Sequence, residues 1–194
     1  MAANRRASAR VMVPAILALT LTGMSSPALA RMVVTGPFGT GLTEPVWVLQ
    51  HLLGFLAIGL WAGRGGGAAV WQVPASALTA VLAAGLAAHL GVRLPYAGQG
   101  LAASLIVIGA LVAIDLSMPL VVAVLVAAVA ALFHGYVHMG GPFFWGGFAA
   151  GTLLILAAGV GLAAILGTAS SVRAIQLCGG AVALFGLLDL TGVL

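Results

Sequence analysis

Residues 117–138, with the sequence SMPLVVAVLVAAVAALFHGYVH, carry the pattern that decides the fold. From Leu120 to Leu132 this stretch has no charged or strongly polar side chain, and it ends with two histidines, His134 and His138. A helical run of about 20 apolar residues matches the hydrocarbon thickness of a bilayer. The stretch therefore predicts a transmembrane helix that carries two imidazoles at one end.

The rest of the chain repeats this pattern. Of its 194 residues 63% are hydrophobic and only 5% are charged, which leaves too little polar surface for a soluble domain. Breaks that are rich in glycine and polar residues divide the chain after residue 44 into six expected segments: 45–63, 68–90, 97–114, 117–138, 142–166 and 172–194. Such short breaks force neighbouring helices to run antiparallel, so we expect an all-α membrane protein with one compact bundle over residues 45–194. Gly59 and Gly63, and likewise Gly147 and Gly151, have the spacing that permits close helix packing.

The N-terminus has the features of a targeting segment. Three arginines precede an apolar core, and residues 28–30, Ala-Leu-Ala, form a small-x-small cleavage site. We expect a signal peptide over residues 1–30 that is cleaved after Ala30, with an uncleaved extra helix as the alternative. A short polar tail over residues 31–44 would then lie in the periplasm, and the bundle would lie in the bacterial cytoplasmic (inner) membrane.

Several function classes fit the sequence poorly. The seven basic residues are arginines spread along the chain, which argues against nucleic-acid binding. Cys178 is the single cysteine, so neither a disulfide nor a thiolate metal site is available. Ser104 lacks the Gly-x-Ser-x-Gly context of a hydrolase nucleophile, and we predict no catalytic residue and no enzymatic activity.

The expected orientation brings the ionisable residues to one level of the membrane. If the mature N-terminus is periplasmic, the outer ends of the helices carry His51, His89, His134, His138, Glu44, Gln50 and Asp189. Of the three acidic residues, only Asp115 lies on the cytoplasmic side, where it would cap a helix or mark an ion exit.

The spacing of His134 and His138 predicts a metal clamp. Residues four apart on a helix are displaced by about 40° and about 6 Å, so both rings can reach one ion. Imidazole nitrogen suits first-row transition metals such as Zn, Cu, Ni and Fe. The alternative is that these histidines lie at the water interface and bind only water or backbone groups.

The same residues resemble a known family. Residues 133–138, FHGYVH, resemble the F-H-G-x-x-H segment of the HupE/UreJ family, which comprises small bacterial membrane proteins regarded as nickel or cobalt permeases that serve hydrogenase and urease maturation. Residues 44–62, EPVWVLQHLLGFLAIGLWA, are similar to that family's H-P-x-x-G-x-D-H element and its A-x-G-L-W-A continuation. The resemblance spans roughly residues 42–166.

The motif also departs from the family. Glu44 stands where the family has His, Val48 where it has Gly, and Gln50 where it has Asp, while Tyr136 stands where another His is frequent. Carboxylate oxygen can still bind a metal, but an amide at position 50 lacks the charge that attracts a dication.

The resemblance implies a permease that takes up nickel or cobalt from the periplasm and holds no resident cofactor. The ion would bind His134 and His138 with help from His51 and Glu44, and a second set of candidates comprises His89, Gln50 and Asp189. Asp189 would orient a histidine from the second coordination shell or lie at the interface. Expected partners are the lipid bilayer, the divalent ion, and hydrogenase or urease maturation proteins or another membrane complex. The alternative is an accessory or assembly subunit that keeps the scaffold without transport.

Overall fold

The computed structural model describes residues 36–136, 140–168 and 172–194, and these residues are helical with short connections. The expected signal peptide, residues 1–30, lies outside the described residues. The helices are α3 (Pro37–Trp47), α4 (Leu49–Gly65), α5 (Ala69–His89), α6 (Ala97–Ala113), α7 (Leu120–Tyr136), α8 (Pro142–Thr168) and α9 (Val172–Leu190). Helices α4 to α9 correspond to the six expected segments, with ends that differ by a few residues.

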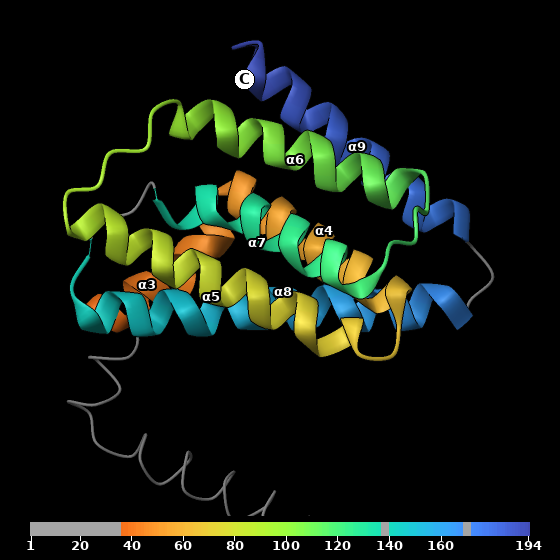
Figure 1. The fold of residues 1–194 in the computed structure, drawn as a ribbon, viewed down its shortest axis with the longest axis horizontal. Coiled ribbons are helices and arrows are strands. Elements are labelled where there is room, and N and C mark those ends of the chain that lie inside the picture. The colour runs from red at the N-terminus through yellow and green to blue at the C-terminus, as the bar shows by residue number, and fades with distance from the viewer. Residues whose placement is uncertain (1–35, 137–139, 169–171) are drawn as a thin grey trace, which may run out of the picture.

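Helix α4 is the centre of the bundle. It contacts every other helix of the described chain, and nine of its 17 residues are buried. The most extensive contacts in the bundle are those of α5 with α7, of α6 with α9, and of α8 with both α3 and α4. Figure 1 shows α6 and α9 side by side along one edge of the bundle and α3 and α8 along the opposite edge.

Close approach of α8 to α3 and α4 depends on glycine. A Cβ on Gly59 would lie 2.2 Å from the carbonyl oxygen of Leu156, and one on Gly147 would lie 2.0 Å from that of Phe38. Side chains at these positions would separate the helices, because each contact is with backbone. The predicted packing role of Gly59 and Gly147 is therefore confirmed, with α8 and α3 as the respective partners.

Residues 37–44 differ from the expected tail, because they belong to α3. Pro37 stands in the first turn, where its fixed φ suits a helix and its missing N–H costs nothing. Glycine-rich composition predicts a loop, but the small residues let α3 pack on α8: a Cβ on Gly41 would lie 2.0 Å from the carbonyl oxygen of Phe144. The expected first segment, 45–63, is also divided, because α3 and α4 meet at Val48 with a bend of 76°.

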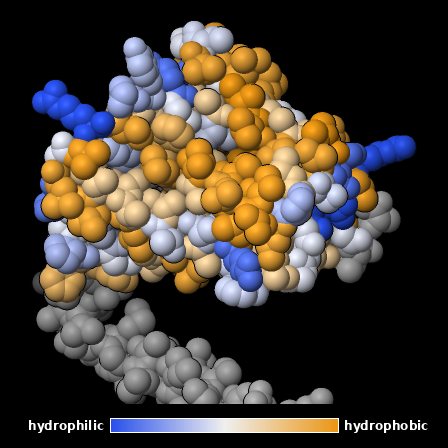
Figure 2. Space-filling model, in the orientation of Figure 1, coloured by the Kyte–Doolittle hydropathy of each residue, from blue (hydrophilic) through white to orange (hydrophobic). Residues whose placement is uncertain are grey.

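The outside of the bundle is largely apolar. Helices α5, α8 and α9 are long and apolar enough to cross a membrane, and the bent pair α3 and α4 would make a fourth span. Helices α6 and α7 are apolar with 17 residues each. Figure 2 shows hydrophobic side chains over much of one face. Among the exposed apolar residues of the bundle are Val121, Leu125 and Val129 of α7. Exposed apolar surface of this extent suits contact with lipid.

The helices alternate in direction, which gives the bundle two distinct ends. At the histidine end, Gln50 at the start of α4 lines a pocket with Gln99 near the start of α6 and Asp189 near the end of α9. At the Arg64 end, Arg64 in the last turn of α4 contacts Asp115, which follows α6. Polar residues from distant parts of the sequence thus meet at each end.

Candidate functional site

His51 and His134 form a buried pair at the histidine end. His51 lies in the first turn of α4 and is fully buried, and His134 lies in the last turn of α7 with 1% of its surface exposed. Their Nδ1 atoms are 2.9 Å apart, which is a hydrogen-bond distance between two residues 83 positions apart in sequence. The structure thereby brings together two of the predicted metal ligands.

Ser104 of α6 extends this pair. Its Oγ lies 3.0 Å from Nε2 of His134, and its hydroxyl also donates to the carbonyl oxygen of Leu101 at 2.7 Å. Ser104 is 6% exposed, so this contact is buried together with the imidazoles. The sequence indicates no histidine at the level of Ser104, and this expectation is wrong, because Nε2 of His134 lies within hydrogen-bond distance of the hydroxyl. A serine in the interior of a helix whose other residues, apart from Gln99 near its start, are apolar was the available signal.

Apolar rings and one glycine surround the two imidazoles. The ring centroid of Phe55 lies 5.0 Å from that of His134, and the ring of Phe148 meets the edge of His51 at 5.9 Å. A Cβ on Gly54 would lie 2.5 Å from Cε1 of His134. The imidazoles therefore occupy a closely packed apolar site that a larger residue at position 54 would disturb.

The other predicted ligands lie in different surroundings. His89 ends α5 and is exposed, in a pocket formed with the start of α8 around Trp145. Gln50 and Asp189 line the polar pocket described above, and Glu44 is half-buried in α3. His138 lies outside the described residues. Within the residues that the structure describes, no three His, Cys, Asp or Glu side chains form a cluster able to hold a metal.

Tyr136, near the end of α7, holds the loop between α5 and α6. Its phenol accepts a hydrogen bond from the backbone N–H of Leu94 at 2.6 Å and donates one to the carbonyl oxygen of Val92. This loop borders the histidine end, so the phenol fixes the end of α7 that carries His134.

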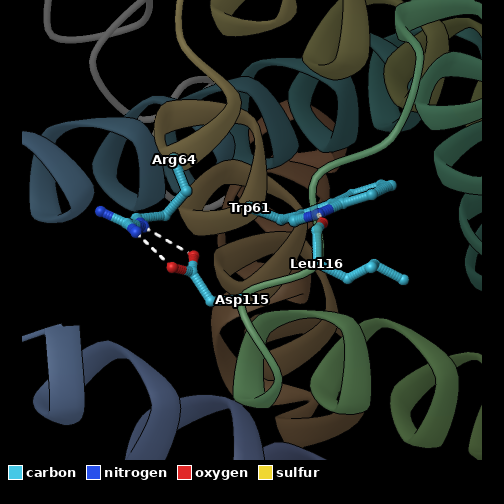
Figure 3. Close-up of polar contacts among 4 residues, drawn as sticks. All are labelled: Trp61, Arg64, Asp115 and Leu116. Carbon is cyan, nitrogen blue, oxygen red and sulfur yellow. Dashed lines mark hydrogen bonds and ion pairs between the residues drawn. The ribbon is translucent and has the colours of Figure 1, made fainter.

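At the Arg64 end, Asp115 forms an ion pair. The guanidinium of Arg64 donates to both carboxylate oxygens, with Nε to Oδ1 at 3.0 Å and Nη2 to Oδ2 at 2.5 Å (Figure 3). Next to this pair, the indole of Trp61 donates to the carbonyl oxygen of Leu116 at 3.2 Å (Figure 3). Both contacts tie the loop after α6 to the end of α4, which gives Asp115 a structural partner.

Comparison with known proteins gives a consistent relationship. The family model described as HupE / UreJ protein matches residues 17–188. The chain is also similar to protein HupE of Rhizobium leguminosarum bv. viciae, with 35% identity over 184 residues, which cover 89% of this chain and 96% of that protein. No solved structure matches the chain.

Proposed function

We propose that this chain, which belongs to the HupE/UreJ family, is an integral membrane permease that takes up nickel or cobalt. The observation that carries the proposal is the buried pair of His51 and His134, with facing nitrogens 2.9 Å apart. Burying two imidazoles among aromatic rings is costly unless their nitrogens find partners. A site for a transition-metal ion would account for two imidazoles buried among aromatic rings.

The separation of the two nitrogens, which is an ordinary hydrogen-bond distance, is also compatible with a metal of this class. Two metal–nitrogen bonds of about 2.0–2.1 Å at a right angle place their nitrogens about 2.9 Å apart, whereas a tetrahedral angle requires about 3.4 Å. Right-angled arrangements are those of square-planar or octahedral ions, and the former is typical of Ni(II) and Cu(II). An ion can therefore replace the hydrogen bond between the rings if the rings rotate and their nitrogens keep this separation.

We extend the site with the predicted residues at the same end. His138 and Glu44 complete the proposed ligand set with His51 and His134, and the pocket of Gln50 and Asp189 offers a polar approach from the periplasm. On the inward side, Thr152 of α8 lies one helical turn beyond Phe148. Its hydroxyl is buried and has no hydrogen-bond partner among the described residues. This hydroxyl is a polar atom that a passing ion could use after leaving the histidines.

The alternative function is an accessory or assembly subunit without transport. The amide of Gln50 in place of a carboxylate favours it, because a pocket with one less negative charge attracts a dication less strongly. Asp189 weakens this argument against transport, since its carboxylate lines the same pocket and can supply a negative charge there. Hydrogenase or urease maturation proteins are the proposed partners in either case.

Uptake of nickel and cobalt in cells that express the chain tests the proposal. We expect His51→Ala, His134→Ala and the double variant His134→Ala/His138→Ala each to lower uptake by at least about tenfold, because each removes an ion ligand. His89→Ala is the matched control, since it removes an exposed imidazole from the same end. Equal uptake by wild type and all of these variants, at equal membrane abundance, would contradict the permease and favour the accessory subunit.

A further inference from the structure

We infer that the pocket of Gln50, Gln99 and Asp189 is a second cation site, which binds hydrated divalent cations through oxygen atoms without selecting among them. Delivery of an ion from this pocket to the histidines rests on the proposed function. Cation binding to the pocket does not, and it can be tested on a chain that transports nothing.

Three oxygen-bearing side chains from distant parts of the sequence line this pocket. Gln50 is the second residue of α4, Gln99 is the third of α6, and Asp189 is the last but one of α9. Among the described residues that line the pocket, none is basic. Carboxylate and carbonyl oxygens suit Mg²⁺, Ca²⁺ and Mn²⁺, and amides also form hydrogen bonds with the water molecules around an ion. This set therefore suits divalent cations in general.

Asp189 supplies the negative charge of the pocket. Of the chain's three acidic residues, Asp115 is paired with Arg64 at the other end of the bundle and Glu44 lies in α3. Asp189 stands near the end of α9, where the backbone carbonyls already give the helix a partial negative charge that disfavours a further carboxylate. Helix stability therefore does not account for an acid at this position, whereas a cation in the pocket would offset both charges.

The size and exposure of the pocket suit an ion that keeps its water. The cavity has a volume of about 320 Å³. One water molecule takes about 30 Å³ in the liquid, so an ion fits together with several of its water molecules. Gln99 is exposed, and Gln50 and Asp189 are half-buried, so water reaches the site. An ion that binds here avoids the cost of losing its hydration shell.

The pocket and the buried histidines differ in what they can bind. His51 follows Gln50 in the first turn of α4, but His51 is fully buried among aromatic rings. Imidazole nitrogen favours transition metals, whereas oxygen ligands also accept Mg²⁺ and Ca²⁺. We therefore expect the pocket to raise the local concentration of any divalent cation, and the histidines to select among the ions that it supplies.

The structural alternative is that Asp189 only compensates the positive starts of two helices. The N-cap residues of α4 and α6, Val48 and Tyr96, provide no side-chain hydrogen bond, and a nearby carboxylate would stabilise such helix starts. With this role alone, Asp189→Asn lowers the free energy of unfolding in detergent micelles and leaves cation binding unchanged. That pair of results would overturn the inference.

Paramagnetic Mn²⁺, added to the full chain in detergent micelles, tests cation binding. The chain has four glutamines, and their ¹⁵N-labelled side-chain amides report where the ion binds, because Mn²⁺ broadens only nearby signals. Gln50 and Gln99 line the pocket. Gln72 and Gln176 lie near the starts of α5 and α9, at the other end of the bundle. We expect the first two signals to broaden at Mn²⁺ concentrations about tenfold lower than the other two. Equal broadening of all four would overturn the inference.

Charge variants test the role of Asp189. We expect Asp189→Asn to raise the Mn²⁺ concentration that half-broadens the Gln99 signal by about tenfold, because a dication and a carboxylate in contact distance attract by this order even in water. Asp115→Asn is the matched control, since it removes the same charge at the other end, and it should change nothing. Gln50→Asp/Asp189→Asn moves the charge to another wall of the pocket and should restore binding. Unchanged broadening in Asp189→Asn would overturn the inference.

A gain of charge keeps the test decisive if Asp189→Asn does not accumulate. Gln99 is exposed, and Gln99→Glu places a second carboxylate in the first turn of α6, where it also favours the helix. We expect the Mn²⁺ concentration that half-broadens the Gln50 signal to fall by about tenfold. No change in this variant would contradict a cation site in the pocket.

Binding of Mn²⁺ to the histidines would also broaden the signal of Gln50, because His51 is its neighbour. His51→Ala/His134→Ala separates the two sites. We expect this double variant to retain the broadening of Gln50 and Gln99, since Mn²⁺ favours oxygen ligands. Loss of broadening in the double variant would place the ion at the imidazoles and overturn the inference.

Nickel uptake tests delivery to the histidines. We expect Asp189→Asn to raise the nickel concentration for half-maximal uptake by about tenfold, and Gln50→Asp/Asp189→Asn to restore it. Added Mg²⁺ should raise the same concentration in wild type and have less effect in Asp189→Asn, because it competes only at the pocket. Mn²⁺ binding together with unchanged uptake in Asp189→Asn would overturn delivery and leave the cation site standing. Failure of the permease proposal is a separate result, since it appears as absent uptake in wild type.

Discussion

The two ends of the bundle use polar residues in opposite ways. At the histidine end, His51, His134 and Ser104 are buried and joined by hydrogen bonds between groups that can all be neutral. At the Arg64 end, a full ion pair with Asp115 remains partly exposed, with 27% and 33% of the two side chains accessible.

The difference follows from the cost of desolvation. A buried charge loses several kcal/mol of hydration, whereas a neutral imidazole with satisfied nitrogens loses much less. Charges therefore suit an end that water reaches, and neutral polar groups suit a closely packed site such as the one at the histidine end. Changes at the histidine end should have large effects on function, and changes at the Arg64 end should have small effects that salt reduces.

Gly54→Ala gives the largest effect that we predict for the comparison. The new Cβ would lie 2.5 Å from Cε1 and 2.8 Å from Nε2 of His134, so the ring must move away from Ser104 or from His51. We expect at least a tenfold loss of nickel uptake, and overpacking should lower the free energy of unfolding by about 1–3 kcal/mol. Uptake assays and unfolding in detergent micelles measure the two quantities.

Gly161→Ala is the control for this change. It also lies within a helix, α8, but a Cβ there meets no other atom within 4 Å. We expect uptake and stability close to wild type. Wild-type uptake by Gly54→Ala, with Gly161→Ala also unchanged, would show that transport does not require the observed position of the His134 ring.

Tyr136→Phe should have an intermediate effect at the same end. The change removes the phenol that bonds Leu94 and Val92, so the loop between α5 and α6 loses two hydrogen bonds. Because the loop is near water, we expect a loss of about 1 kcal/mol in the free energy of unfolding and at most a threefold loss of uptake. A tenfold loss of uptake with unchanged stability would instead place the phenol in the ion site.

Sequence patterns predicted helices α4 to α9 but not helix α3. Helices α4 to α9 followed from apolar runs bounded by glycine, proline and arginine, because these residues interrupt both hydropathy and helix geometry. Helix α3 did not, since its stability depends on packing against α8 at Gly41 and Gly147, which no local pattern reveals.

The sequence predicted the membrane level of the candidate site but not the contacts between its residues. His51 and His134 were expected at one membrane level, because each stands near the end of an apolar run that faces the same side. Their hydrogen bond, and the one to Ser104, depend on the rotation of α4, α6 and α7 about their axes. Helix rotation is set by packing between segments up to 83 residues apart, and a single sequence does not contain it.

Asp115→Asn is the smallest change that we predict, and it tests the Arg64 end. It removes one charge from a partly exposed pair, and pairs of this kind contribute about 0–1 kcal/mol. We expect a loss of this size in unfolding experiments at low salt and a smaller difference at high salt, because ions screen exposed charges. Arg64→Ala and the double variant complete a mutant cycle whose coupling energy reports the pair alone.

For nickel uptake, we expect Asp115→Asn to stay within twofold of wild type, since the Asp115 carboxylate is bound to Arg64 and is not a proposed ligand of the ion. A tenfold loss of uptake in Asp115→Asn but not in Arg64→Ala would give Asp115 a place in that path and remove the functional contrast between the two ends.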